Sequence, residues 1–203
     1  MSADSRFARD TAVERLDDGR YHGTIDPGWA VIEGAAPNGG YVMALAARAM
    51  RQPIPHPDPV TLTAHFLAPP EVGAIDIHVE VVRTGRRHST ATARLVQGDR
   101  ERARLIGTFA DLSTVADGPD LRVDRAPPDL PPVADCLDAT AAGVRRGKEG
   151  GFPAPPILVR FDHRMPPEMA GWAEGRPLGR GDRRVRRLGR RRDHGHAGPA
   201  GRR

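Results

Sequence analysis

The sequence predicts an α+β fold in which an antiparallel sheet wraps around one central helix. Residues 41–50 are rich in alanine, and their larger apolar side chains recur at spacings of three and four, which is the period of a helix. Later segments alternate apolar and polar residues, which is the period of a strand, and short turn sequences such as TGRRH separate them. Strands joined by such short turns run antiparallel. These segments are residues 60–67, 74–85, 89–97 and 102–112.

A hairpin precedes the helix. Residues 10–16 and 20–25 are predicted as two short strands, because Asp18 and Gly19 between them tolerate the positive φ of a tight turn. The four later strands are expected to form a meander in chain order, with one apolar face wrapped around the helix. Since the other side of the helix is mostly alanine, we expect the helix to be buried on nearly every side.

Composition divides the chain into segments. A stretch rich in Pro and Asp follows the last strand, a weak helix is predicted at residues 133–146, and ILVRFDHRM reads as the opening strand of a second unit. The expected organisation is a domain over residues 1–115, a linker over 116–156, the start of a second unit over 157–175 and a disordered tail rich in Arg and Gly over 176–203.

The tail accounts for the basic charge. Residues 176–203 hold eleven Arg and two Asp, which is a net +9, so the overall charge of +5 leaves −4 on the rest of the chain. One interpretation is a basic tail that binds nucleic acid or an anionic surface. The other is a change of reading frame, because high-GC codons read in a shifted frame yield Arg, Gly, Pro and Ala. In either case the segment lacks the apolar residues of a core.

The sequence gives no reason to expect a membrane protein, a secreted protein or a metal site. The sequence has no run of 18 apolar residues and no apolar segment typical of a secretory signal, so neither a membrane span nor secretion is expected. The single cysteine, Cys136, fits a reducing cytoplasm and is read as a small packed residue. No Cys/His spacing of a metal site occurs, and no metal is expected.

Several motifs together carry a resemblance to a known family. They are Trp-x-Val before Gly-x-x-Pro-Asn-Gly-Gly-Tyr, then HPDPVTLTAHFLAPP, Val-x-x-x-Arg-x-Gly-Arg, ARLVQ and TFADL. Over residues 7–113 the chain resembles the N-terminal half of the thioesterase-like superfamily, of the acyl-CoA thioesterase II (TesB-like) type with tandem hotdog repeats. RFDHRMPPEMAGW, residues 160–172, is similar to the start of the second repeat.

The resemblance implies a hotdog fold, an acyl-CoA ligand and hydrolysis of its thioester without a metal, the coenzyme A thioester being substrate and not cofactor. Asn38, Gly39 and Gly40 become the candidate catalytic residues, because bare amides at a helix N-terminus can hold a developing oxyanion. The structural alternative is that the glycines only turn the chain tightly. Asn38 either caps the helix or touches the thioester.

The resemblance also suggests substrate-binding residues, each with a structural alternative. Trp29 and Tyr41 would border the acyl group, although Trp29 also reads as a packing residue. His65 would lie near the thioester or face outward on its strand, and Arg86 would contact coenzyme A phosphates or stay a solvated turn residue.

A general base is missing from the helix. Residues 41–50 contain no carboxylate, and the resemblance places the acidic residue in the second repeat. Asp58 and His65 are the nearest polar candidates, but Asp58 reads as a loop residue and Gln97 as a structural one.

Two hypotheses follow. The first is a lipid-metabolising hydrolase, an acyl-CoA thioesterase truncated after its first repeat, with weak or absent activity. The second is a non-catalytic acyl-CoA-binding or structural protein. Because one repeat leaves an apolar flank uncovered, self-association into a homo-oligomer or poor solubility is expected. Nucleic-acid binding through the tail is a minor third hypothesis.

Overall fold

The computed structural model of the protein describes residues 5–32, 36–114, 129–150 and 154–171. The predicted tail over 176–203 and the first part of the linker lie outside these residues. The helices and strands of the N-terminal part are α1 (Arg6–Asp10), β1 (Val13–Asp17), β2 (Arg20–Ile25), the 3-10 helix η1 (Pro27–Trp29), β3 (Ala30–Ile32), β4 (Ala36–Pro37), α2 (Gly39–Arg51), β5 (Asp58–Phe66), β6 (Gly73–Thr84), β7 (His88–Gln97), β8 (Arg100–Ala110) and the 3-10 helix η2 (Leu112–Thr114).

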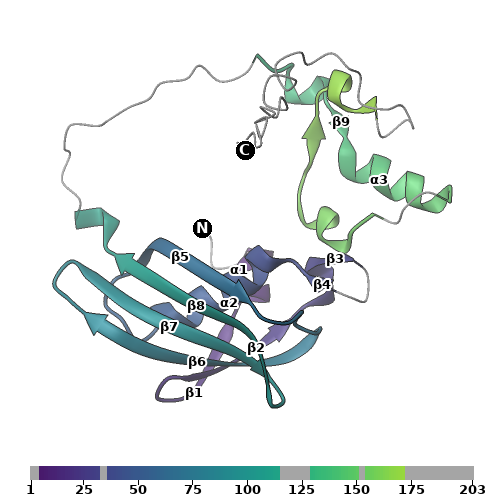
Figure 1. The fold of residues 1–203 in the computed structure, drawn as a ribbon. Coiled ribbons are helices and arrows are strands. Elements are labelled where there is room, and N and C mark those ends of the chain that lie inside the picture. Colours follow the sequence, from purple (N-terminus) through teal and green to yellow (C-terminus); the bar gives the residue numbers. More distant parts are fainter. Residues whose placement is uncertain (1–4, 33–35, 115–128, 151–153, 172–203) are drawn as a thin grey trace, which may run out of the picture.

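One antiparallel sheet dominates the structure. Its six strands lie in the order β1-β2-β6-β7-β8-β5, and every neighbouring pair is antiparallel. The sheet curves around α2, which crosses its concave face (Figure 1). The predicted α+β fold with a sheet around a central helix is therefore confirmed, and the helix begins two residues earlier than its apolar period indicated.

The predicted four-strand meander is wrong for its first strand. β5 pairs with β8 at one edge of the sheet, whereas β6 pairs with β2 and β7. Residues 67–72, which connect β5 and β6, therefore cross the ends of two strands and do not form a simple turn. That crossing covers about 14 Å at normal strand spacing, and six extended residues reach about 20 Å.

Hydrogen bonds hold this crossing segment against the sheet. The amides of Leu67 and Ala68 both donate to the Arg102 carbonyl oxygen. The side-chain amide of Gln97 accepts from the Glu71 amide at 2.8 Å and donates to the Glu71 carbonyl oxygen at 2.9 Å. The structural interpretation of Gln97 agrees with these contacts.

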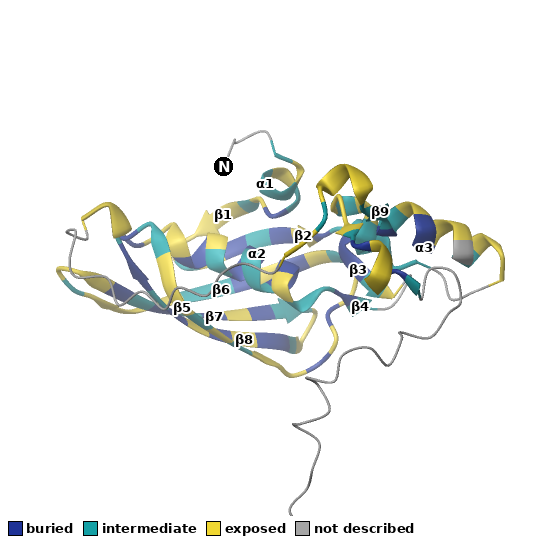
Figure 2. Cartoon of the chain, turned by 90° about the horizontal axis from the view of Figure 1, so that it is seen from above, coloured by how far each residue is buried: buried dark blue, intermediate teal, exposed yellow. Residues whose placement is uncertain are grey.

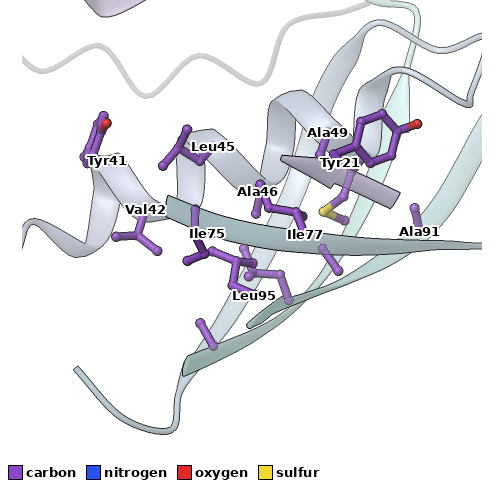
Figure 3. Packing of buried hydrophobic residues seen from close by; sticks show 14 of the residues in the cluster. Tyr21, Tyr41, Val42, Leu45, Ala46, Ala49, Ile75, Ile77, Ala91 and Leu95 are labelled. Carbon is purple, nitrogen blue, oxygen red and sulfur yellow. The ribbon is translucent and has the colours of Figure 1, made fainter. Parts of the chain in front are cut away.

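The core lies between α2 and the sheet. Val42, Leu45, Ala46, Ala49 and Met50 of α2 are all buried. They pack on apolar side chains of the concave face, and Figure 3 shows Val42 and Ala46 of the helix beside Ile75 and Ile77 of the sheet. The strand residues are Tyr21, Ile75, Ile77, Ala91, Ala93, Leu95, Ala103, Leu105 and Phe109. Several are alanines, so the helix can approach the sheet closely.

The opposite side of α2 is less covered than expected. Met43, Ala44 and Ala47 are half-buried, and Arg48 and Arg51 are exposed. The prediction that the helix is buried on nearly every side is therefore wrong, because within the described residues the sheet covers only one face (Figure 2).

The predicted hairpin is confirmed with one change. β1 and β2 pair antiparallel, and Gly19 in their turn has a φ of 77°, which favours glycine. A side chain at this position would also meet the Val79 carbonyl oxygen at 2.6 Å. The strand predicted from residue 10 begins at Val13 instead, because Ser5 caps α1 and residues 6–10 are helical.

The C-terminal part forms a small second group of elements. It contains the 3-10 helix η3 (Val133–Asp135), β9 (Leu137–Asp138), α3 (Ala139–Lys148), the 3-10 helix η4 (Pro156–Arg160), β10 (Arg164–Met165) and the 3-10 helix η5 (Pro167–Met169). The predicted strand over 157–165 is wrong for most of its length, because Pro155 and Pro156 begin a 3-10 turn. Within this range the described strand is β10, which pairs with β9.

Candidate functional site

The N-terminus of α2 carries the predicted glycine pair. The Asn38 side-chain oxygen accepts from the Tyr41 amide at 3.1 Å, so Asn38 caps the helix. The Gly39 and Gly40 amides have no intrahelical acceptor at this position, and within the described residues no other group accepts from them. The positive end of the helix dipole adds to their attraction for an anionic oxygen.

An apolar cleft opens beside this helix end. Its volume is about 420 Å³, and Gly39 forms part of its wall. The remaining lining residues are Ala36, Pro37, Val42, Phe66, Leu67, Ala68, Pro69 and Pro70. The cleft therefore joins β4, the start of α2 and the segment that crosses the ends of the strands. Its size and apolar walls fit a small apolar group.

The backbone at Gly39 faces Phe66. A Cβ atom at Gly39 would lie 3.1 Å from the Phe66 ring, which is tighter than an ordinary contact. Phe66 is 48% exposed, so it is a wall of the cleft and not part of the core. A glycine here keeps the amide open to a ligand while the ring closes against the backbone.

Among the described residues that line this cleft, none carries a carboxylate or an imidazole. Asp58 lies at the other end of β5, about 26 Å along the strand from Phe66, and accepts from the Leu112 amide at 2.9 Å. Glu71 follows the lining prolines but forms an ion pair with Arg102. Across the described residues, no group of His, Cys, Asp and Glu side chains could hold a metal ion.

Trp29 and Tyr41 lie behind the helix end and do not line the cleft. Their rings stack with centroids 5.2 Å apart, and both side chains are buried. The Trp29 indole donates to Asp10 at 2.9 Å, and the Tyr41 hydroxyl accepts from the Asp26 amide at 3.1 Å. Burial raises the pKa of Tyr41. These contacts support packing and positioning roles.

The structure does not bring His65 or Arg86 to Gly39. His65 is exposed on the face of β5 opposite to Leu62 and Ala64, which point toward the helix. Arg86 is exposed in the turn between β6 and β7, and its carbonyl oxygen contacts His56 just beyond the other end of the helix. The helix is about 20 Å long, so this turn is remote from the cleft.

A second cleft lies between α1 and β2, with a volume of about 480 Å³. Charged and polar residues line it, including Asp10, Glu14, His22 and Asp26. Asp10 and Asp26 already bond to Trp29 and Arg160, and His22 contacts Asp76 at 3.0 Å. Its size alone does not make it the better candidate, because Asp10, His22 and Asp26 are engaged in these contacts.

Sequence reasoning missed two features of the site. Phe66 and the segment over 67–70 form one wall of the cleft, and no local pattern placed them beside the glycine pair. Arg160 reaches Asp26 and the Gly28 carbonyl oxygen from the C-terminal part. No local pattern could reveal this contact, since 134 positions separate Arg160 from Asp26.

Comparisons with known proteins find thioesterase-like relatives of the N-terminal part of the chain. Residues 25–110 match the model of the acyl-CoA thioesterase N-terminal domain. A thioesterase-like protein, TwmA from Talaromyces wortmannii, is 37% identical over 99 residues, which are 47% of this chain and 28% of that protein.

Solved structures of similar fold include a thioesterase and a hotdog-fold protein. A structure described as a thioesterase II from Thermobifida fusca is 28% identical with a TM-score of 0.67, over 88% of this chain and 61% of its own. A hotdog-fold protein from Alicyclobacillus acidocaldarius is 25% identical with a TM-score of 0.53, over 64% of this chain and 47% of its own. The chain thus spans less than two thirds of each of these relatives. No described helix is long and apolar enough to cross a membrane. Over residues 25–110 the chain is similar to acyl-CoA thioesterase N-terminal domains, and its sheet around a central helix is the hotdog fold.

Proposed function

We propose that the chain acts on acyl-CoA thioesters, with the thioester carbonyl oxygen bound at the Gly39 and Gly40 amides. The observation that carries the proposal is the coincidence of two features at one place. The first two amides of α2, those of Gly39 and Gly40, have no acceptor among the described residues. An apolar cleft of about 420 Å³ lies beside Gly39. An acyl group in the cleft would put its carbonyl beside the amides.

The chemistry would be hydrolysis. Water attacks the thioester carbon, the carbon–sulfur bond breaks, and the developing negative charge on oxygen is held by N–H donors and the helix dipole. Such preorganised donors each contribute roughly 10²- to 10³-fold to the rate. A carboxylate that orients the water must come from outside the described lining, since that lining holds none.

This same lack favours a second candidate function. A cleft whose described lining holds no base would bind an acyl-CoA thioester without turning it over. A non-catalytic acyl-CoA-binding or structural protein is therefore the alternative.

One pair of measurements separates the two. Release of free coenzyme A from acyl-CoA esters of increasing chain length is followed with a thiol reagent, and binding of a non-hydrolysable thioether analogue is followed by calorimetry. Turnover supports the thioesterase, and binding without turnover supports the alternative. If the full chain neither binds nor hydrolyses any of these compounds, both are wrong.

Two accompanying proposals concern cofactor and assembly. We propose that no cofactor beyond the thioester is required, so a chelator should leave the rate unchanged. We also propose a homo-oligomer, because β5 is an edge strand and carries the exposed apolar residues Val60 and Phe66. Light scattering that shows only a monomer at assay concentration would refute this second proposal.

A further inference from the structure

Arg160 lies in an unusual place for a charged side chain. It is only 7% exposed, and it leaves the C-terminal part to reach the turn η1 of the N-terminal part. Its guanidinium donates to Asp26 Oδ1 at 2.8 Å and to the Gly28 carbonyl oxygen at 3.1 Å. It also lies 5.6 Å from the centre of the Trp29 ring. A buried arginine with this set of partners is held in one geometry.

The turn is shaped to accept this arginine. A Cβ atom at Gly28 would lie 1.6 Å from an Arg160 nitrogen, so only glycine leaves room for the guanidinium. The Asp26 carboxylate that receives Arg160 also accepts from the Gly28 amide at 2.7 Å and so fixes the turn. Phe161 adds an edge-to-face contact with Trp29, the ring centroids being 5.9 Å apart.

The same turn holds the start of α2. The Trp29 carbonyl oxygen accepts from the Asn38 amide at 2.8 Å, and Asn38 caps the helix. The Trp29 ring stacks on Tyr41, whose hydroxyl accepts from the Asp26 amide. Two independent connections therefore lead from the Arg160 contacts to the residues on either side of Gly39 and Gly40.

We propose that Arg160 is a positioning residue for the helix N-terminus, so that docking of residues 156–163 onto the turn η1 sets the place of the Gly39 and Gly40 amides. This inference rests on the proposed function only where it concerns rate. The C-terminal part would thereby regulate the thioester site without lining the cleft. If residues 156–163 were displaced, the cleft would stay in place, but the Gly39 and Gly40 amides would be misaligned with it.

The test uses the full chain and compares Arg160→Ala with Arg164→Ala. Arg164 belongs to the same part of the chain but pairs with Asp162, also in that part, so it is the matched control. In protein labelled with ¹⁵N-glycine, Arg160→Ala should shift the Gly39 and Gly40 amide resonances, and Arg164→Ala should not. If the wild type turns over acyl-CoA, kcat should fall on the order of 10-fold or more with KM nearly unchanged.

A second variant covers the case in which Arg160→Ala folds poorly. Gly28→Ala should displace the guanidinium and produce similar amide shifts, while the double variant should resemble Arg160→Ala alone. Arg160→Lys should give smaller amide shifts than Arg160→Ala, because lysine keeps the charge but cannot donate to both acceptors as the planar guanidinium does.

The two proposals fail differently. Unchanged Gly39 and Gly40 resonances in both Arg160→Ala and Gly28→Ala would overturn the positioning role, whatever the activity. A wild type without binding or turnover would overturn the proposed function, and the amide resonances would still decide the role of Arg160. If Arg160→Ala lowered kcat/KM only through a raised KM, this would also count against the positioning role, since it would assign Arg160 to substrate binding.

Discussion

Gly39→Ala separates the functional from the structural interpretation of the glycine pair. In a helix, alanine is more favourable than glycine by about 1 kcal/mol. The new methyl group would lie 3.1 Å from the Phe66 ring, which must move by a few tenths of an ångström. Because Phe66 is 48% exposed, we expect it to move at little cost. The free energy of unfolding should therefore stay the same or rise by up to about 1 kcal/mol.

Function should change in the opposite direction. The methyl group projects into the cleft at the wall where the thioester would approach the amide, so the carbonyl oxygen would lose close contact with its donor. Loss of one such donor costs on the order of 10²-fold in rate, which is close to 3 kcal/mol. We expect kcat/KM to fall about 100-fold, or the affinity for the thioether analogue to fall at least about 10-fold if the chain only binds.

The assay pairs urea unfolding with coenzyme A release or calorimetry on the same preparations. Gly143→Ala is the control, because Gly143 also lies in a helix, α3, does not line the cleft, and a Cβ atom there would meet the Ala154 side chain at an ordinary 3.6 Å. A Gly39→Ala protein with wild-type kinetics and affinity would refute the functional interpretation. A strongly destabilised Gly39→Ala protein would instead show that the backbone needs glycine for folding.

Further predictions concern single residues. Asn38→Ala should lower the free energy of unfolding by about 1 kcal/mol through loss of the helix cap, whereas Asn38→Asp should keep the cap but slow turnover by placing a negative charge beside the developing oxyanion; unfolding and rate measured together check both. Leu45→Ala should cost about 2–5 kcal/mol in thermal or urea unfolding, because Leu45 is fully buried between helix and sheet. Arg104 and Arg94 lower the pKa of Glu101 to about 2, so Glu101→Gln should destabilise by roughly 1 kcal/mol at pH 7. Since the stabilisation is present above the usual pKa of 4.5 and is lost as the pH falls through about 2, the two proteins should converge in acid. Tyr21→Phe should leave stability unchanged or raise it by up to about 1 kcal/mol in urea unfolding, because the buried hydroxyl has no hydrogen-bond partner among the described residues.

Local patterns identified most of the elements of the sheet domain. The helix predicted over residues 41–50 spans Gly39–Arg51, and the strand predicted over 74–85 spans Gly73–Thr84. Both follow from the period of their apolar side chains, which each residue and its near neighbours fix. The strand predicted over 157–165 was wrong, because consecutive prolines favoured a 3-10 turn over an extended segment with apolar composition.

The candidate site was predictable only in part. Asn38, Gly39 and Gly40 could be singled out, since two glycines at a helix start are unusual in any fold. Trp29 and Tyr41 were assigned to substrate binding, but they bury their rings behind the helix end. Their positions in the sequence beside the glycines did not reveal the direction of their side chains. Their roles in substrate binding stay predictions, since neither side chain lines the cleft.

The sequence by itself determined the central helix, most strands of the sheet and the glycine pair at the helix start, because these depend on neighbours along the chain. Only the tertiary structure decided that β5 pairs with β8, that Phe66 closes a cleft at Gly39 and that Arg160 reaches the turn at Gly28. Each of these joins residues far apart in sequence, and many chain paths satisfy the same local pattern. Packing of the whole molecule selects one path among them.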